Sequence, residues 1–145
     1  KDGQKSWNSH FPLKTKVMNK CIVKTAAILI ALAIILGALS AHALEKVLTP
    51  SSLDSFKTAV TYQFYAAFGV LMVALSEDKF TTKLKSFYRL LLTGTLLFSG
   101  SIYMLSTKDL HGLHLPFLGP ITPIGGILMI AAWISLAVGL FRQRN

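Results

Sequence analysis

Two histidines, His111 and His114, lie three residues apart and form the pair in this sequence whose spacing could bind a metal ion. On a helix this spacing would place both imidazoles on one face, where they could coordinate zinc. Gly112 and Pro116 disfavour a helix at this position, however, and Asp109 is the only carboxylate nearby. We therefore predict no metal site and interpret both histidines as loop residues.

His42 is the other candidate for chemistry, because it ends a long apolar run and Glu45 follows about one helical turn later. The simpler interpretation is a histidine at a helix end that hydrogen-bonds a loop carbonyl. A contact with haem or a quinone is the alternative. Haem in a helix bundle normally takes two axial ligands, and no second histidine lies inside an apolar run. We predict no cofactor. In the haem or quinone alternative, His42 is the residue that would contact it.

The sequence contains no HExxH motif, no phosphate-binding glycine loop and no Ser-His-Asp set, so we expect no enzymatic activity. No acidic or basic residue lies near the centre of an apolar run, which argues against ion-coupled transport. The net charge of +9 resides in short segments between apolar runs rather than on a polar face, so we predict no nucleic-acid partner.

The residues that must position these candidates are mostly apolar. Of the 145 residues, 52% are hydrophobic and only 14% are charged, whereas about 25% are charged in a typical soluble domain. The mean hydropathy is +0.55. A chain this small has too much surface to dissolve with so few charges, so the composition predicts an integral membrane protein. Its one cysteine, Cys21, allows no intramolecular disulfide.

Four apolar runs approach the roughly 20 residues that a membrane-spanning helix needs. We expect spans at about 22–43, 56–75, 87–105 and 121–141. The connections are short, so the predicted fold is all-α: a four-transmembrane-helix up-down bundle formed by residues 21–145. Residues 1–20 form a basic cytoplasmic arm, of which 1–17 could be an upstream extension, a cloning remnant or a native segment.

Basic residues gather on one side of the predicted bundle. Twelve of the 15 lie before the first span or at its start, around the connection 76–86, or after the last span. The other side has only Lys46, Lys57 and Lys108. The positive-inside rule therefore predicts that both termini are cytoplasmic. We expect a multi-pass membrane protein.

Small and polar residues predict which helix faces meet, because lipid gives apolar helices little reason to associate. The residues expected to pack helices closely are Ala33, Gly37, Ala41, Gly125 and Gly126. Hydroxyl stripes on the second and third spans should face each other, since their groups need partners away from lipid. The expected polar interior comprises Thr58, Tyr62, Gln63, Tyr65, Thr95, Ser99 and Tyr103.

Gln63 is the most polar residue deep in a span. An interhelical hydrogen bond is the simpler interpretation, and a ligand contact in a bundle cavity is the alternative. At the helix ends, Thr49 is a natural N-cap with Pro50 in the first turn. Thr122 and Pro123 suggest the same arrangement for the fourth span, with a partly unwound, cavity-lining entry as the alternative.

Several separated blocks of sequence resemble one membrane-protein family. They are residues 36–44 (LGALSAHAL), 48–50 (LTP), 56–65 (FKTAVTYQFY), 97–103 (LFSGSIY) and 119–126 (GPITPIGG), with Trp133. In these blocks the chain resembles the bacterial inner-membrane proteins grouped as domain of unknown function 423, of the UPF0382 type. It is also similar to the transmembrane protein 256 group of eukaryotes. The resemblance extends from about Met18 to the C-terminus and implies a four-helix membrane protein of uncharacterised function.

One departure from the family bears on the haem alternative. Where the family commonly has Tyr-His-Ala in the second helix, this chain has Tyr65, Ala66 and Ala67. If the family used that histidine with His42 as paired ligands, this chain could not. The resemblance therefore weakens the haem alternative here.

The leading functional prediction is a non-catalytic accessory or scaffold subunit of a larger membrane complex, because the chain is small and its helix faces suit helix–helix contact. One alternative is a small-molecule or lipid-binding/transport protein with a Tyr/Gln/Ser-lined cavity. Another is a haem- or quinone-binding redox subunit that uses His42. The expected partners are the lipid bilayer and other membrane subunits or further copies of the chain.

Overall fold

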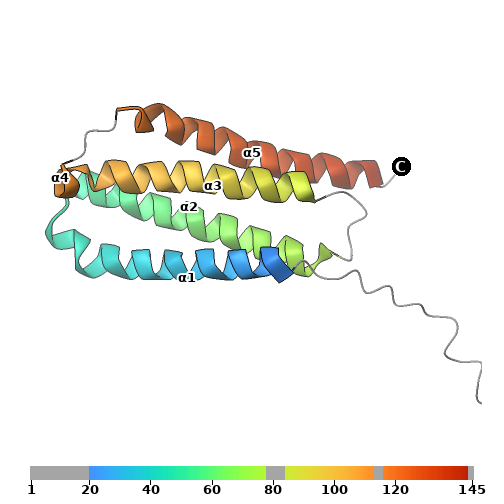
Figure 1. Cartoon of the computed structure of the whole chain (residues 1–145), viewed down its shortest axis with the longest axis horizontal. Helices are drawn as coiled ribbons and strands as arrows, with labels where there is room; N and C mark the ends of the chain where they lie inside the picture. Colours follow the sequence, from blue (N-terminus) through green and yellow to red (C-terminus); the bar gives the residue numbers. More distant parts are fainter. Residues whose placement is uncertain (1–19, 78–83, 113–115, 144–145) are drawn as a thin grey trace, which may run out of the picture.

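The structure is a computed structural model that describes residues 20–77, 84–112 and 116–143. Four long helices dominate it, and each is long and apolar enough to cross a membrane. The elements are α1 (Lys20–His42), η1 (Leu44–Lys46), α2 (Pro50–Leu75), α3 (Lys85–Ser106), α4 (Lys108–His111) and α5 (Leu118–Gln143) (Figure 1). The predicted all-α class and four spans are confirmed. Residues 1–17 lie outside the described residues.

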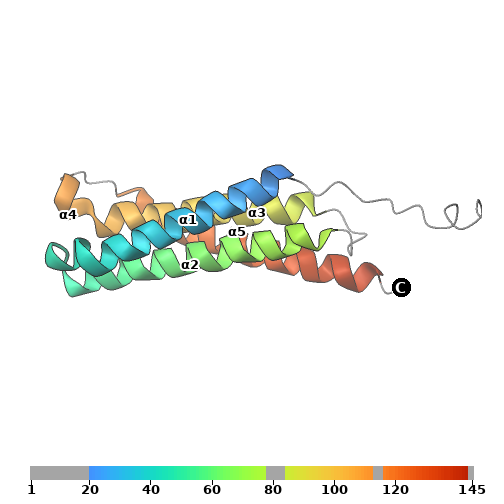
Figure 2. The ribbon, with the colours of Figure 1, turned by 90° about the horizontal axis from the view of Figure 1, so that it is seen from below.

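The long helices run alternately up and down, and each packs mainly on its neighbour in sequence: α1 on α2, α2 on α3, and α3 on α5 (Figures 1 and 2). The middle helices are the most buried. In the most apolar window, 39% of residues are buried in α2 and 33% in α3, against 11% in α1 and 17% in α5. The bundle therefore has two inner and two outer helices.

The two ends of the bundle carry different elements. The start of α1 and the end of α5 lie at the same end of the bundle, and we call this the terminal end (Figure 1). The short elements η1 and α4 lie at the opposite end, which we call the α4 end (Figure 1). The α4 end also holds the beginning of α2, the end of α3 and the beginning of α5, so these three helix termini lie near one another.

Helix α2 begins as its sequence predicts. Thr49 has an extended backbone (φ −65°, ψ 153°), and its hydroxyl oxygen accepts a hydrogen bond from the Ser52 N–H at 3.3 Å. Pro50 occupies the first turn, where its missing N–H leaves no helical hydrogen bond unmade. This cap fixes where α2 starts and so which residues of α2 share a face.

Helix α5 differs from its prediction. It begins at Leu118, so Thr122 is not its N-cap and Pro123 lies inside the helix. A proline removes one backbone hydrogen bond, here the bond to the carbonyl of Gly119, and this is tolerated in membrane helices when neighbouring groups compensate. The Thr122 hydroxyl contacts the Ser101 hydroxyl on α3 at 2.6 Å and the Leu118 carbonyl at 3.4 Å. It therefore joins two helices instead of capping one.

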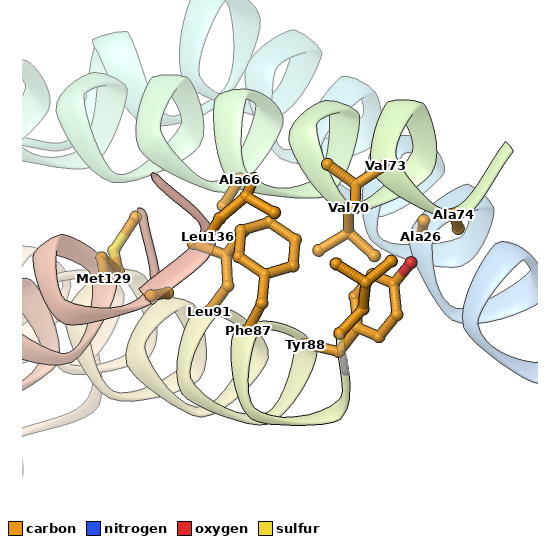
Figure 3. Packing of buried hydrophobic residues seen from close by; sticks show 12 residues of the cluster. Ala26, Ala66, Val70, Val73, Ala74, Phe87, Tyr88, Leu91, Met129 and Leu136 are labelled. Carbon is orange, nitrogen blue, oxygen red and sulfur yellow. The ribbon is translucent and has the colours of Figure 1, made fainter. Parts of the chain in front are cut away.

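The largest packed cluster centres on α3. Figure 3 shows Phe87 and Leu91 of α3 beside Ala66 of α2 and Leu136 of α5. Phe87 and Leu91 are among the largest fully buried side chains, and the Phe87 ring also meets Trp133 of α5 edge-on at 5.3 Å. Between lipid-solvated helices such contacts act through close packing rather than through exclusion of water.

Small residues set the closest helix approaches. On α1 the buried residues Ala26, Ala33 and Ser40 recur every seven residues, which gives a narrow seam against the rest of the bundle. Between α3 and α5 the approach is tighter. A Cβ added at Gly125 would collide with the backbone N of Phe98 and lie 2.9 Å from the carbonyl oxygen of Gly94. The two backbones therefore touch directly at this point.

The contact at Gly125 predicts a sharp difference between two adjacent glycines. Gly125→Ala should lower the free energy of unfolding by about 1–3 kcal/mol, because the added methyl overpacks a backbone contact. Gly126→Ala is the matched control, since its Cβ would meet the Phe98 ring at an ordinary 3.6 Å and should change stability by less than about 0.5 kcal/mol. Reversible unfolding in mixed micelles measures both. Equal losses would contradict the assigned contact.

Candidate functional site

A hydrogen-bonded centre joins three of the four long helices. The Gln63 side chain of α2 is buried, and its Nε2 donates to the Leu29 carbonyl of α1 at 2.9 Å. The Tyr103 hydroxyl of α3 donates to the Oε1 of Gln63, also at 2.9 Å. Both the nitrogen and the oxygen of the Gln63 amide are thus hydrogen-bonded to protein groups. This geometry supports the interpretation of Gln63 as an interhelical hydrogen-bonding residue.

Two other predicted interior residues lie in the same seam between α2 and α3. Ser99 is buried, and its hydroxyl donates to the Ala59 carbonyl across the helix interface at 2.9 Å. Thr95 is buried as well, but its hydroxyl donates within its own helix to the Leu91 carbonyl at 2.7 Å. The seam is therefore a structural contact whose polar groups bond to the protein itself.

The remaining predicted members of the polar interior lie elsewhere. Tyr62 is 46% exposed, Tyr65 is 65% exposed, and Thr58 is exposed with its hydroxyl donating to the Asp54 carbonyl in its own helix. The expected meeting of the two hydroxyl stripes is therefore wrong for α2. One residue turns an α-helix by about 100°, so Gln63 and Tyr62 cannot both point inward.

Of the residues predicted to pack helices, Ala33 is buried on α1, and a Cβ at Gly37 would meet Val60 of α2 at 3.5 Å. Ala41 is exposed. Gly125 lies in the backbone contact between α5 and α3, and Gly126 beside it faces the Phe98 ring. The structure thus brings four of these five residues to helix interfaces.

Tyr62 and Tyr65 line a lateral groove, which we define as the groove of about 430 Å³ between α2 and α5 to which α3 also contributes. The Tyr62 ring lies 5.1 Å from the Phe98 ring and 6.4 Å from the Tyr65 ring. The residues that line the groove are Tyr62, Tyr65, Ala66, Phe98, Gly126, Met129, Ile130 and Trp133. The groove is therefore aromatic and apolar, with tyrosine hydroxyls as its main polar groups.

Tyr62 and Tyr65 lie near the middle of the length of α2. Tyr62 is the thirteenth of the 26 residues of α2, which places it at the middle of a helix about 39 Å long. Within the described residues, neither the Tyr62 nor the Tyr65 hydroxyl has a hydrogen-bond partner. An unpaired hydroxyl in an apolar medium costs about 2–7 kcal/mol. The lateral groove is thus lined by two tyrosines whose hydroxyls a bound acceptor would satisfy.

A second hollow lies at the α4 end. We call it the hydroxyl pocket; it has a volume of about 350 Å³. It is lined by Ser51, Ser52, Ser55, Thr58, Ile102, Leu105, Ser106, Lys108 and Thr122. Ser106 is only 4% exposed, and its hydroxyl has no hydrogen-bond partner in the part of the chain that the structure describes. The pocket therefore combines several hydroxyls with one cation.

The structure describes two of the three predicted histidine candidates, His42 and His111. His42 is the exposed last residue of α1, and no loop carbonyl among the described residues accepts a hydrogen bond from it. His111 is the last residue of the short helix α4, so its prediction as a loop residue is wrong; Gly112 follows it as the C-cap. The Nε2 of His111 lies 3.2 Å from the carbonyl oxygen of Met104, while His114 falls outside the described residues. Across residues 20–77, 84–112 and 116–143, no three His, Cys, Asp or Glu residues group together. The absence of a metal site stays a prediction.

Comparison with known proteins identifies the family. The family described as "Protein of unknown function (DUF423)" matches residues 36–126, from the second half of α1 to the start of α5. The chain belongs to this family. The resemblance seen in the sequence is thereby confirmed, and the family description gives no activity.

Three curated relatives of the chain are each named a UPF0382 membrane protein. The chain is 39% identical to one from Haemophilus influenzae over 113 residues, 76% of this chain and 85% of the relative. It is 36% identical to YwdK of Bacillus subtilis over 121 residues, 82% and 94% of the two chains. A Schizosaccharomyces pombe relative is 37% identical over 123 residues, 81% and 98%. No solved structure matches significantly.

Tyr103 and Tyr62 offer a matched test of the hydrogen-bonded centre. Tyr103→Phe removes the donor to Gln63 and should lower the free energy of unfolding by about 0.6 kcal/mol, and by no more than about 1.7 kcal/mol. Tyr62→Phe deletes the same atom from a tyrosine that has no hydrogen-bond partner among the described residues, so it should not destabilise the protein. Reversible unfolding in micelles compares them. A larger loss for Tyr62→Phe would contradict the assignment.

Proposed function

We propose that this member of the family is a non-catalytic membrane protein that binds a lipid-soluble molecule in the lateral groove. The observation that carries the proposal is the pair of unpartnered hydroxyls, Tyr62 and Tyr65, at the middle depth of α2. A ligand with a hydrogen-bond acceptor would satisfy them and fill the groove. This is a binding function, but at the side of the bundle rather than in the central cavity that the sequence suggested.

A non-catalytic role is supported by what lines the lateral groove. Its polar side-chain groups are the two tyrosine hydroxyls and the indole N–H of Trp133; the other lining residues described are apolar. A general acid–base step or a covalent step needs a nucleophile with a base in hydrogen-bond reach. The groove residues supply no such pair, whereas aromatic walls with few polar groups are typical of binding sites.

An accessory subunit of a larger membrane complex is the second candidate function. The observation that favours it is the outer face of α1, where Ala27, Ala31 and Ala38 are exposed at helical spacing. Small residues on a lipid-facing surface allow another helix to approach closely. A partner that co-purifies in fixed ratio from mild detergent, and is lost in Ala31→Phe, would support this candidate.

The lateral groove predicts different effects for two matched isoleucines of α5. Ile130 lines the groove and is 62% exposed, while Ile127 is 64% exposed but is not among the groove residues. Ile130→Trp should fill the groove and reduce the amount of co-purified lipid-soluble molecule severalfold, and Ile127→Trp should not. Mass spectrometry of organic extracts from purified protein measures this. The same content in both variants would contradict the proposed function.

We also propose that the protein resides in a bacterial cytoplasmic membrane with the terminal end in the cytoplasm. The distribution of basic residues supports this orientation, because cytoplasmic segments are enriched in lysine and arginine. The described residues at the terminal end include Lys20, Lys24, Lys85, Arg89 and Arg142. The α4 end has only Lys46, Lys57 and Lys108. The hydroxyl pocket would then face the outer leaflet.

Single cysteines at the two ends test this orientation. In a Cys21→Ser background, Val47→Cys marks the α4 end and Ser86→Cys marks the terminal end, and both positions are exposed. A membrane-impermeant maleimide should label Val47→Cys in intact spheroplasts, because that end faces outward. It should label Ser86→Cys only after the membrane is opened. The reverse pattern would contradict the proposed orientation.

A further inference from the structure

We propose that the molecule held in the lateral groove is a glycerophospholipid, with its phosphate in the hydroxyl pocket beside Lys108 and one acyl chain along the groove. This inference rests on the proposed binding function and adds to it the chemical class of the ligand. It follows from how the pocket and the groove are arranged along the same three helices, how deep each lies, and which charges line them.

The hydroxyl pocket and the lateral groove share one face of α2. Ser51, Ser55 and Thr58 line the pocket, and Tyr62 and Tyr65 line the groove. The successive spacings are four, three, four and three residues, which keeps all five side chains on one side of an α-helix. The two hollows therefore follow each other along α2.

The same order holds on the other two helices. On α5, Thr122 lines the pocket while Gly126 and Ile130 line the groove, again at intervals of four residues. On α3, Ile102 lines the pocket and Phe98 lines the groove one turn away. All three helices thus lead from the hydroxyl pocket to the lateral groove, and this order matches a molecule with a polar head and an apolar tail.

The depths of the two hollows match the two parts of a lipid. From Ser51 to Tyr65 the rise along α2 is about 21 Å, since each residue adds about 1.5 Å. Half of the hydrocarbon core is about 15 Å thick. With Tyr62 near the midplane, Ser51 lies at about headgroup level, and the lateral groove lies among the acyl chains. A phospholipid would therefore need no displacement from its normal depth.

Charge favours a phosphate in the hydroxyl pocket. Lys108 is the one charged residue among its described lining residues; Asp54 and Asp109 are exposed at the same end but do not line it. An ammonium group and hydroxyl donors are the groups that bind phosphate oxygens. The start of α2 adds a positive helix dipole at Ser51. An uncharged headgroup would leave Lys108 without an anion in the pocket.

Two donors in the hydroxyl pocket are free to bind the headgroup. Within the described part of the chain, the Ser51 and Ser106 hydroxyls donate to no protein group. Ser106 is the more informative, because a buried hydroxyl without a partner is costly and such groups in folded proteins are usually satisfied. A phosphate or glycerol oxygen would supply the missing acceptor.

The test compares two lipids that differ only in the headgroup. Full-length protein, purified and delipidated in mild detergent, is offered dioleoylphosphatidylglycerol or dioleoylglycerol, and native mass spectrometry measures how much of each is retained. The phospholipid should be retained about tenfold better, because its phosphate can accept hydrogen bonds from a charged group and dioleoylglycerol has no phosphate. Ile130→Trp should abolish retention of both lipids.

Two lysines at the α4 end provide matched variants. Lys108→Gln should bring retention of the phospholipid down to the level of dioleoylglycerol, because it removes the cation of the hydroxyl pocket. Lys46→Gln removes an exposed lysine at the same end that is not a lining residue, and it should leave the tenfold preference intact. Ser106→Ala should reduce the preference severalfold without affecting dioleoylglycerol.

Three results would contradict the inference, and they have different consequences for the proposed binding function. If both lipids bind equally and Ile130→Trp abolishes both, the phosphate assignment is wrong but the groove still binds a lipid-soluble molecule. If Ile130→Trp changes nothing, the proposed function fails as well. If copies of the chain cross-link through Ile130→Cys and no lipid is retained, the occupant of the groove is a second copy.

Discussion

The buried amide of Gln63 determines which side of α2 faces the rest of the bundle. A primary amide in a bilayer needs hydrogen-bond partners, and it finds them in the Leu29 carbonyl of α1 and the Tyr103 hydroxyl of α3. With Gln63 held inward, the helical period turns Tyr62 and Tyr65 away from this centre and toward α5. The lateral groove and its unpartnered hydroxyls are therefore a consequence of where one glutamine side chain must point.

The second constraint is the backbone contact of α3 with α5. Gly94 and Gly125 let the two helices touch, and the hydroxyls of Ser101 and Thr122 join them nearby. Because α5 is fixed on α3, it stands beside α2 without closing fully against it, and the space between them is the groove. Met129 and Trp133 of α5 form part of that wall, so the same contact that stabilises the bundle also shapes the candidate site.

The sequence predicted the parts of this structure that follow from local chemistry. Length and hydropathy located the four spans, Thr49 and Pro50 located the start of α2, and the stripe from Thr58 to Tyr65 was correctly placed on one helix face. It did not reveal that this stripe faces outward, because Gln63 and Tyr62 are adjacent and either could have pointed inward. That choice depends on partners on α1 and α3, which are distant in sequence.

The hydroxyl pocket also could not be predicted, because it too depends on contacts between residues that are distant in sequence. Lys108 and Ser106 follow the third span and look like ordinary loop residues in the sequence; only the meeting of three helix ends places them beside Ser51 and Ser55. The stripe on α2 does continue upstream through Ser55 to Ser51 at the same spacing, which is a signal in the sequence. The prediction that Thr122 caps the fourth span was wrong. A threonine before a proline commonly begins a helix, but here the Thr122 hydroxyl contacts a hydroxyl of α3.

The most direct measurement is an experimental structure of the full chain in a lipid nanodisc, determined with a rigid fiducial attached. We expect elongated density between Tyr62, Phe98 and Trp133 that ends beside Lys108, with the Gln63 side chain hydrogen-bonded to the Leu29 carbonyl and the Tyr103 hydroxyl. A groove closed by protein side chains, or a bundle in which Gln63 faces lipid and the tyrosines face inward, would contradict it.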